Sequence, residues 1–123
     1  MASSEHRQSI QELLDHSKGP LSADEIRETL GHRSIGQATV YRLLRQGVED
    51  GLYREVSFPD HPKRYELMDT EHHHYFLCHQ CDRAFDVQGC LKQVSKLAPA
   101  GFEVTDHDIL LHGQCFDCVE MKS

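Results

Sequence analysis

Residues 34–67 read SIGQATVYRLLRQGVEDGLYREVSFPDHPKRYEL, and this stretch decides the fold of the first half of the chain. Its first part carries an apolar stripe at helical spacing, formed by Val40, Leu43 and Leu44. Ser34 lies three residues before Gln37 in the pattern of a capping box, and it therefore marks the start of a helix. Gly47 follows the stripe, so we expect the helix to end at about residues 45–46.

The second part of the stretch has the pattern of a β-hairpin. Residues 52–58 and 64–67 read as two short strands, and the turn-rich segment 59–63 with its two prolines separates them. We expect these strands to pair around a loop.

Two further helices are expected before this stretch. In residues 7–16 the apolar side chains recur at helical spacing, namely Ile10, Leu13 and Leu14. The next helix begins after Ser22, which can form a capping box with Glu25, and Gly31 marks its end. Three helices followed by a hairpin describe a winged helix-turn-helix, which we place in residues 1–68 as a DNA-binding domain.

The third helix and the hairpin supply the candidate DNA contacts. The side chains that we expect to reach phosphates and base edges are Thr39, Tyr41, Arg42, Arg45, Lys63 and Arg64. Residues 1–65 carry nine Lys/Arg and ten Asp/Glu, whereas residues 66–123 carry four and ten. The nearly neutral first half can therefore present a local cationic face. The alternative is a small helical domain whose arginines are merely solvated.

The composition is that of a folded protein with an unusual supply of metal ligands. The 123 residues are 38% hydrophobic and 27% charged, which excludes a disordered chain and a large multidomain enzyme. No apolar run approaches the roughly 18 residues of a membrane span, and the first residues do not resemble an export signal, so we expect a cytoplasmic location. Five cysteines and ten histidines then favour metal ligation over disulfides.

Two C-x-x-C pairs carry the strongest chemical signal of the second half. They comprise Cys78, Cys81, Cys115 and Cys118, with 33 residues between the pairs. Four thiolates can hold zinc in a closed tetrahedron without a position for catalysis, and a small chain gains folding free energy from the ion. An iron–sulfur cluster, a thiol switch and two separate redox pairs are the alternatives. Cys90 is left over, and we expect a small buried side chain there.

Histidines and carboxylates around the first pair form a second candidate metal constellation. Its members are Glu66, His72, His73, His74, Asp86 and His107, with His112 farther along the chain. Such ligands suit a divalent transition metal held less tightly than in a thiolate cage, as a sensor requires. Alternate residues of a strand share a face, so His72 and His74 can serve one site and His73 another. The alternative is a polar edge strand with solvated histidines.

The remaining elements complete a small α/β metal-binding dimerisation domain, which we place in residues 69–123. Residues 75–77 and 84–87 are expected to be strands, residues 91–98 a short helix, and residues 102–111 one or two further strands. Zinc would join the end of the chain to the first of these strands. An unpaired sheet edge in such a small unit favours a homodimer.

The order of these motifs resembles the ferric uptake regulator superfamily of metal-dependent transcription factors over nearly the whole chain. The resemblance rests on residues 38–42 (ATVYR), residues 64–66 (RYE), the histidine run with its C-x-x-C pair, and residues 112–118 (HGQCFDC). It implies an α+β fold with an N-terminal winged helix, a C-terminal α/β dimerisation domain, a four-cysteine zinc site and a regulatory metal between the domains. It also implies homodimers that bind inverted-repeat operators in double-stranded DNA when metal is bound.

The resemblance also assigns roles to single residues. The family's recognition helix matches the segment with Thr39, Tyr41 and Arg42, and its zinc ligands match the four paired cysteines. Its sensor ligands match Glu66, His73 and Asp86, and those of a further site match His72, His74 and His107. Tyr75 and Pro20 stand where the family has sensor histidines, so fewer of the usual ligands are present. The chain also begins about one helix late relative to the pattern, which we expect to weaken DNA binding.

We therefore predict a repressor of metal-uptake or oxidative-stress genes that Fe²⁺, Zn²⁺ or Mn²⁺ activates for operator binding. A metal that favours the DNA-binding conformation raises the DNA affinity by the same coupling free energy. Two alternatives belong to other classes. One is a metalloenzyme with a three-histidine centre formed by His72, His74 and His107, and the other is a zinc-stabilised interaction module without DNA binding.

Overall fold

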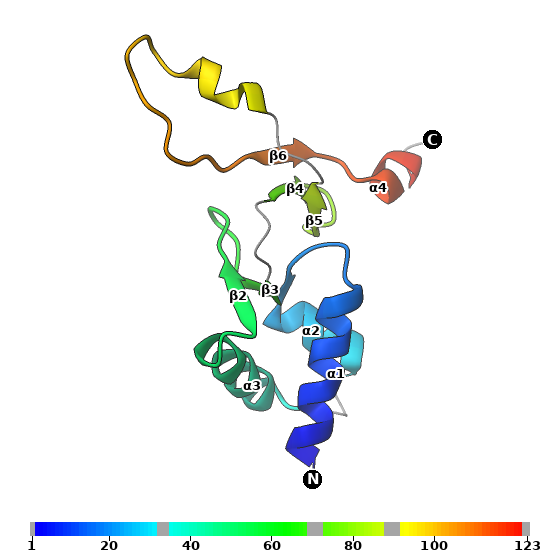
Figure 1. The fold of residues 1–123 in the computed structure, drawn as a ribbon. Coiled ribbons are helices and arrows are strands. Elements are labelled where there is room, and N and C mark those ends of the chain that lie inside the picture. The colour runs from blue at the N-terminus through cyan, green and yellow to red at the C-terminus, as the bar shows by residue number, and fades with distance from the viewer. Residues whose placement is uncertain (1, 32–34, 69–72, 88–91, 122–123) are drawn as a thin grey trace. The chain divides into compact units, whose positions relative to one another are not determined.

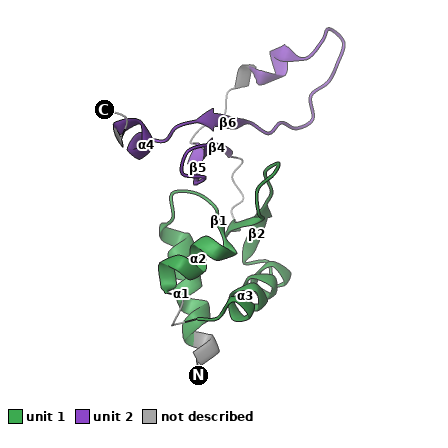
Figure 2. Cartoon of the chain, turned by 180° about the vertical axis from the view of Figure 1, so that it is seen from behind, with its two compact units in different colours: residues 1–70 green, residues 71–123 purple. Residues whose placement is uncertain are grey.

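The computed structural model describes residues 2–31, 35–68, 73–87 and 92–121. It divides into two compact units, residues 1–70 and residues 71–123, which Figure 2 colours separately. Both units mix helix and sheet, so the predicted α+β class is confirmed. Among the described helices, none combines the length and the hydropathy that a membrane span requires.

Unit 1 contains the three helices and the hairpin that the sequence predicts (Figure 1). Its helices are α1 (Ala2–His16), α2 (Ala23–Leu30) and α3 (Gln37–Glu49). Its strands are β1 (Leu21–Ser22), β2 (Tyr53–Val56) and β3 (Arg64–Leu67), which pair antiparallel in the order β1-β3-β2. This is the winged-helix arrangement, in which the β2–β3 hairpin is the wing. The two-residue β1 is too short to leave a periodic pattern in the sequence.

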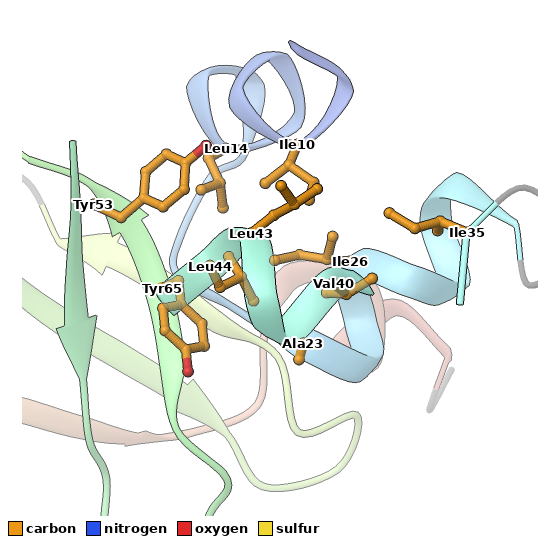
Figure 3. Close-up of a cluster of buried hydrophobic side chains, with 10 residues drawn as sticks. All are labelled: Ile10, Leu14, Ala23, Ile26, Ile35, Val40, Leu43, Leu44, Tyr53 and Tyr65. Atoms are coloured by element: carbon orange, nitrogen blue, oxygen red, sulfur yellow. The ribbon is translucent and has the colours of Figure 1, made fainter. Parts of the chain in front are cut away.

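One apolar core joins the helices of unit 1 to its sheet (Figure 3). Its buried side chains come from the three helices, the segment before α3 and the two wing strands: Ile10, Leu14, Ala23, Ile26, Ile35, Val40, Leu43, Leu44, Tyr53 and Tyr65. The helical spacing of the apolar residues places them on one face of each helix. Because α3 buries one face in this core, its opposite face is left to solvent.

The predicted capping box of α2 is present, and a wing residue joins it. The N–H of Ser22 donates to Glu25 Oε1 at 2.9 Å, and the N–H of Glu25 donates to Ser22 Oγ at 3.2 Å. The same Glu25 oxygen accepts a hydrogen bond from the buried Arg64 guanidinium of β3. One carboxylate therefore caps α2 and ties it to the wing. Gly31 follows α2 with a φ of 94°, which confirms the predicted stop.

The structure corrects both ends of the predicted third helix. The helix begins after Gly36, which is its N-cap, whereas the predicted cap Ser34 lies outside the described residues. At its other end the helix continues two residues beyond Gly47. A Cβ at Gly47 would lie 2.2 Å from two ring carbons of Tyr53. The glycine is therefore a packing position within the helix and not its stop.

Unit 2 consists of a three-stranded sheet and two short helices. Strand β4 (His74–Cys78) pairs antiparallel with β5 (Ala84–Val87) and parallel with β6 (Leu110–Gly113), in the order β5-β4-β6. The short helix predicted at residues 91–98 is a 3₁₀ helix, η1 (Lys92–Leu97). A last helix, α4 (Phe116–Met121), carries no long apolar stripe, and the sequence did not predict it.

The strand predicted over residues 102–111 is mostly wrong. Residues 102–109 have no regular structure, and only Leu110 and Leu111 of that range belong to β6. The apolar side chains that indicated a strand do not line a buried face, since Phe102 is 71% exposed and Val104 is also exposed. The alternating apolar residues of this segment face solvent and not a core, so they do not form a strand within unit 2.

We expect Gly47→Ala to lower the free energy of unfolding of unit 1 by about 1–3 kcal/mol, because the added methyl group overpacks the contact with Tyr53. The measurement is urea unfolding of the full chain, followed by the far-ultraviolet circular dichroism of the helices. Gly36→Ala is the matched control, since a Cβ there meets no atom within 4 Å. Equal unfolding midpoints for the two variants would contradict this account of Gly47.

Candidate functional site

The four paired cysteines come together at one end of the unit 2 sheet and form a cluster that we call the sulfur cage. It joins the end of β4, the turn after it, the residue before α4 and α4 itself, through Cys78, Cys81, Cys115 and Cys118. The sulfurs of Cys78 and Cys118 are 3.6 Å apart, those of Cys81 and Cys115 are 3.8 Å apart, and all four lie within 4.8 Å of one another. A tetrahedral zinc ion with Zn–S bonds of about 2.3 Å requires sulfur separations of about 3.8 Å. The sulfur cage therefore fits a structural zinc ion.

Backbone groups prepare one thiol of the sulfur cage for ionisation. Burial opposes the ionisation of Cys78, but backbone N–H groups outweigh it and lower the pKa of this thiol to about 6. Two of these groups are the N–H of Cys81, 3.5 Å from the Cys78 sulfur, and the N–H of Cys115, at 3.4 Å. Burial and the neighbouring thiols raise the pKa of Cys118 to about 12. A cation is therefore needed before all four sulfurs can be thiolates together.

The sulfur cage is also the centre of the buried core of unit 2. Cys78, Cys115 and Cys118 are buried against one another, and Phe76 and Phe85 pack on them while remaining partly exposed. Figure 1 shows how the yellow and orange segment extends away from the small sheet of this unit. Because the described core of unit 2 is built around these cysteines, we expect the metal to stabilise the tertiary structure of this unit.

His73 and Asp86 are nitrogen and oxygen candidates that unit 2 brings together. His73 Nε2 lies 3.6 Å from Asp86 Oδ1, and both side chains are partly shielded from solvent. Tyr75, at a position where the resemblance expects histidine, makes an edge-on ring contact with His73 at a centroid distance of 5.0 Å. These two candidates can each offer a metal ion one ligand atom, and a tyrosine ring lies beside them.

A second histidine pair connects β4 to the segment before β6. The rings of His74 and His107 have centroids 5.0 Å apart. His74 is buried, and its Nδ1 accepts the N–H of Ile109 at 3.0 Å. The third predicted member of this group, His72, lies outside the described residues, as does Cys90.

Glu66 lies in β3 of unit 1 and already has a cationic partner there. Its carboxylate is buried, and Arg54 Nε donates to its Oε1 at 3.0 Å. The two residues face each other across the wing, because Arg54 is the cross-strand partner of Glu66 in the β2–β3 register. Sequence reasoning did not single out Arg54, although a hairpin with opposite charges at facing positions would have revealed the pair.

The predicted DNA contacts divide into exposed and buried groups. On α3, Tyr41, Arg42 and Arg45 are exposed, and Thr39 is half-buried. On the wing, Lys63 is exposed and lies 3.2 Å from a carboxylate oxygen of Glu55.

Arg64 differs from the other predicted contacts because it is only 2% exposed. Its guanidinium binds Glu25 and stacks over the ring of Phe58 at 6.0 Å. In this structure the residue therefore holds the wing together and is not presented to a phosphate.

Comparisons with known proteins give a consistent result. The model of the ferric uptake regulator family matches residues 1–112. The peroxide-responsive repressor PerR of Staphylococcus aureus is 32% identical over 117 residues, which cover 91% of this chain and 78% of the relative.

Solved structures agree with that match. The Vibrio cholerae ferric uptake regulator superposes with a TM-score of 0.67 at 28% identity, covering 89% of this chain and 88% of that one. The Francisella tularensis ferric uptake regulator with iron gives 0.64 at 26% identity, covering 94% and 92%. A zinc-bound manganese uptake regulator superposes with a TM-score of 0.76 at 22% identity, covering 91% of this chain and 89% of that one. At this identity the likeness shows the fold alone.

We expect removal of metal to unfold unit 2 and to leave unit 1 folded, because unit 1 has an extensive apolar core, whereas the described core of unit 2 is built around the cysteines. The structural ion contributes on the order of 10 kcal/mol in small zinc modules. After treatment with a strong chelator, amide NMR signals of residues 73–121 should collapse to random-coil positions while those of residues 5–68 stay dispersed. Cys118→Ser should have the same effect. Dispersed unit 2 signals in a sample shown by metal analysis to lack zinc would disprove this dependence.

Proposed function

The chain belongs to the ferric uptake regulator family, and from this premise we propose that it represses transcription by binding operator DNA when a divalent metal occupies a sensor site. Members of this family are metal-responsive transcriptional regulators and not enzymes, which sets the three-histidine metalloenzyme aside. The observation that carries the proposal is the division of α3 into a buried apolar stripe and an exposed face with two arginines.

The exposed face of α3 has the chemistry of a recognition helix. Arg42 and Arg45 can each donate several hydrogen bonds to phosphates or to guanine edges, and Tyr41 adds a hydroxyl group and an aromatic face. Lys63 on the wing can reach the DNA backbone once it leaves Glu55. Thr39 is the remaining candidate on α3, whereas the buried Arg64 supports the wing.

The structural zinc ion serves stability and not catalysis. The sulfur cage supplies four thiolates, which complete a tetrahedron and leave no open coordination position. When bound, the ion supplies the positive charge that lets the four sulfurs ionise together.

We place the sensor metal on Glu66, His73 and Asp86, with His74 and His107 as a further candidate pair. The proximity of His73 to Asp86 and the family pattern support the first set. Mixed nitrogen and oxygen ligands accept Fe²⁺, Mn²⁺ or Zn²⁺. If the ion binds the DNA-binding conformation more tightly, a coupling of about 1–3 kcal/mol raises the DNA affinity roughly 5- to 150-fold.

We also propose that the protein acts in the cytoplasm as a homodimer on an inverted-repeat operator. Large apolar side chains of unit 2 lie in solvent in the single chain, since Leu97 is 84% exposed and Phe116 is 78% exposed. The β6 strand is an edge of the three-stranded sheet and can pair with another strand. A twofold axis then sets two recognition helices on two half-sites.

We expect Arg42→Ala to weaken binding to the operator about tenfold or more, since one arginine contact with a base edge contributes roughly that much. The probe is the duplex enriched from a random-sequence library by the Mn²⁺-loaded protein, and the measurement is fluorescence anisotropy at fixed salt. Lys18→Ala is the matched control, because it removes one exposed cation from the same unit. Failure to enrich any duplex would favour the alternative of a zinc-stabilised interaction module without DNA binding. Equal operator affinities for the two variants would exclude α3 as the recognition helix.

We expect His73→Ala to abolish the increase in DNA affinity on addition of Mn²⁺ or Fe²⁺ while the cage keeps one zinc ion per chain. The substitution removes a proposed sensor ligand and leaves all four cysteines in place. His16→Ala is the control, because that histidine is exposed at the end of α1 and belongs to neither candidate metal site. The sensor site lies elsewhere if the His73 variant still responds to added metal as the unaltered protein does.

A further inference from the structure

Arg83 touches one sulfur from each C-x-x-C pair. It lies between the first pair and β5, and its Nε is 3.2 Å from the sulfur of Cys81. Its Nη2 is 3.6 Å from the sulfur of Cys115, although these two cysteines are 34 positions apart in the sequence. A single guanidinium therefore bridges the two halves of the sulfur cage.

Two neighbours hold the guanidinium in this position. Arg83 Nη2 also lies 3.2 Å from Asp117 Oδ2, in the first turn of α4. The ring of Phe85 lies beneath the guanidinium, with its centroid 5.4 Å from Cζ. The arginine is 46% exposed, so its contacts with the sulfurs form an outer layer over the cage.

Arg83 contacts the least buried of the four cysteines. Cys78, Cys115 and Cys118 are buried, whereas Cys81 is only partly buried. Arg83 therefore lies beside the cysteine that is least shielded from a chelator or a competing thiol. Arg83 also lowers the electrostatic cost of the cage. Four thiolates and one Zn²⁺ carry a net charge of −2, and hydrogen bonds from the guanidinium cation disperse that charge.

We propose that Arg83 is a positioning residue that retains zinc in the sulfur cage by bridging Cys81 and Cys115. A planar guanidinium can donate from two nitrogens to two separate sulfurs at once, whereas a lysine offers one compact charge. The bridge keeps the second C-x-x-C pair against the first, so that the loss of one Zn–S bond is followed by its re-formation. This inference depends on zinc in the cage and not on DNA binding.

The test is the rate of zinc release from the full chain to the chromogenic chelator 4-(2-pyridylazo)resorcinol. We expect Arg83→Met to release zinc about tenfold faster than the unaltered protein, because charged hydrogen bonds to two sulfurs are lost. Arg83→Lys keeps the charge and loses the bridge, and should release zinc about threefold faster. Lys96→Met removes an exposed cation of unit 2 that makes no described contact with the cage, and should not change the rate.

A spectroscopic measurement separates this role from a general loss of stability. With Co²⁺ in place of zinc, the sulfur-to-cobalt charge-transfer band should move to longer wavelength in Arg83→Met, since hydrogen bonds lower the energy of the sulfur lone pairs. Arg83→Lys should show a smaller shift and Lys96→Met none. Release from Arg83→Met at the unaltered rate, full restoration by lysine, or faster release with an unshifted band would each overturn the proposal.

Discussion

The meeting of four thiols from two C-x-x-C pairs is the interaction on which the second half of this protein depends. The pairs are separated by 33 residues, and among the described residues of that segment large apolar side chains such as Leu97 and Phe102 are exposed. Bringing the pairs together closes a long loop and therefore has an entropic cost. Zinc binding offsets it, because the ion makes four strong bonds in the folded state alone.

The first half is stabilised in a different way. Its three helices and its wing share one apolar core, and Glu25 joins the start of α2 to Arg64 of the wing. The same packing that buries Val40, Leu43 and Leu44 leaves Arg42 and Arg45 in solvent. The exposed face of α3 is therefore a consequence of the core. The difference in metal dependence that we expect between the two units suits a regulator whose metal supply varies.

Local patterns predicted much of this structure, and their failures have identifiable causes. The apolar stripe of α3 and the capping box of α2 depend on residues three or four positions apart, so spacing alone reveals them. Gly47 was misread as a stop because its role is contact with Tyr53 on another element. Residues 102–109 were misread as a strand because their apolar side chains face solvent in the single chain.

The sequence by itself determined the family, the winged helix, the four cysteines of the cage and the candidate sensor residues, since each follows from residue type and spacing along the chain. Only the tertiary structure decided that Arg64 is buried against Glu25 and that Arg83 bridges Cys81 and Cys115. A long charged side chain can point to solvent or inward with the same local pattern. The residue that it contacts depends on packing between elements that are distant in sequence, and the periodicity of the sequence does not predict that contact.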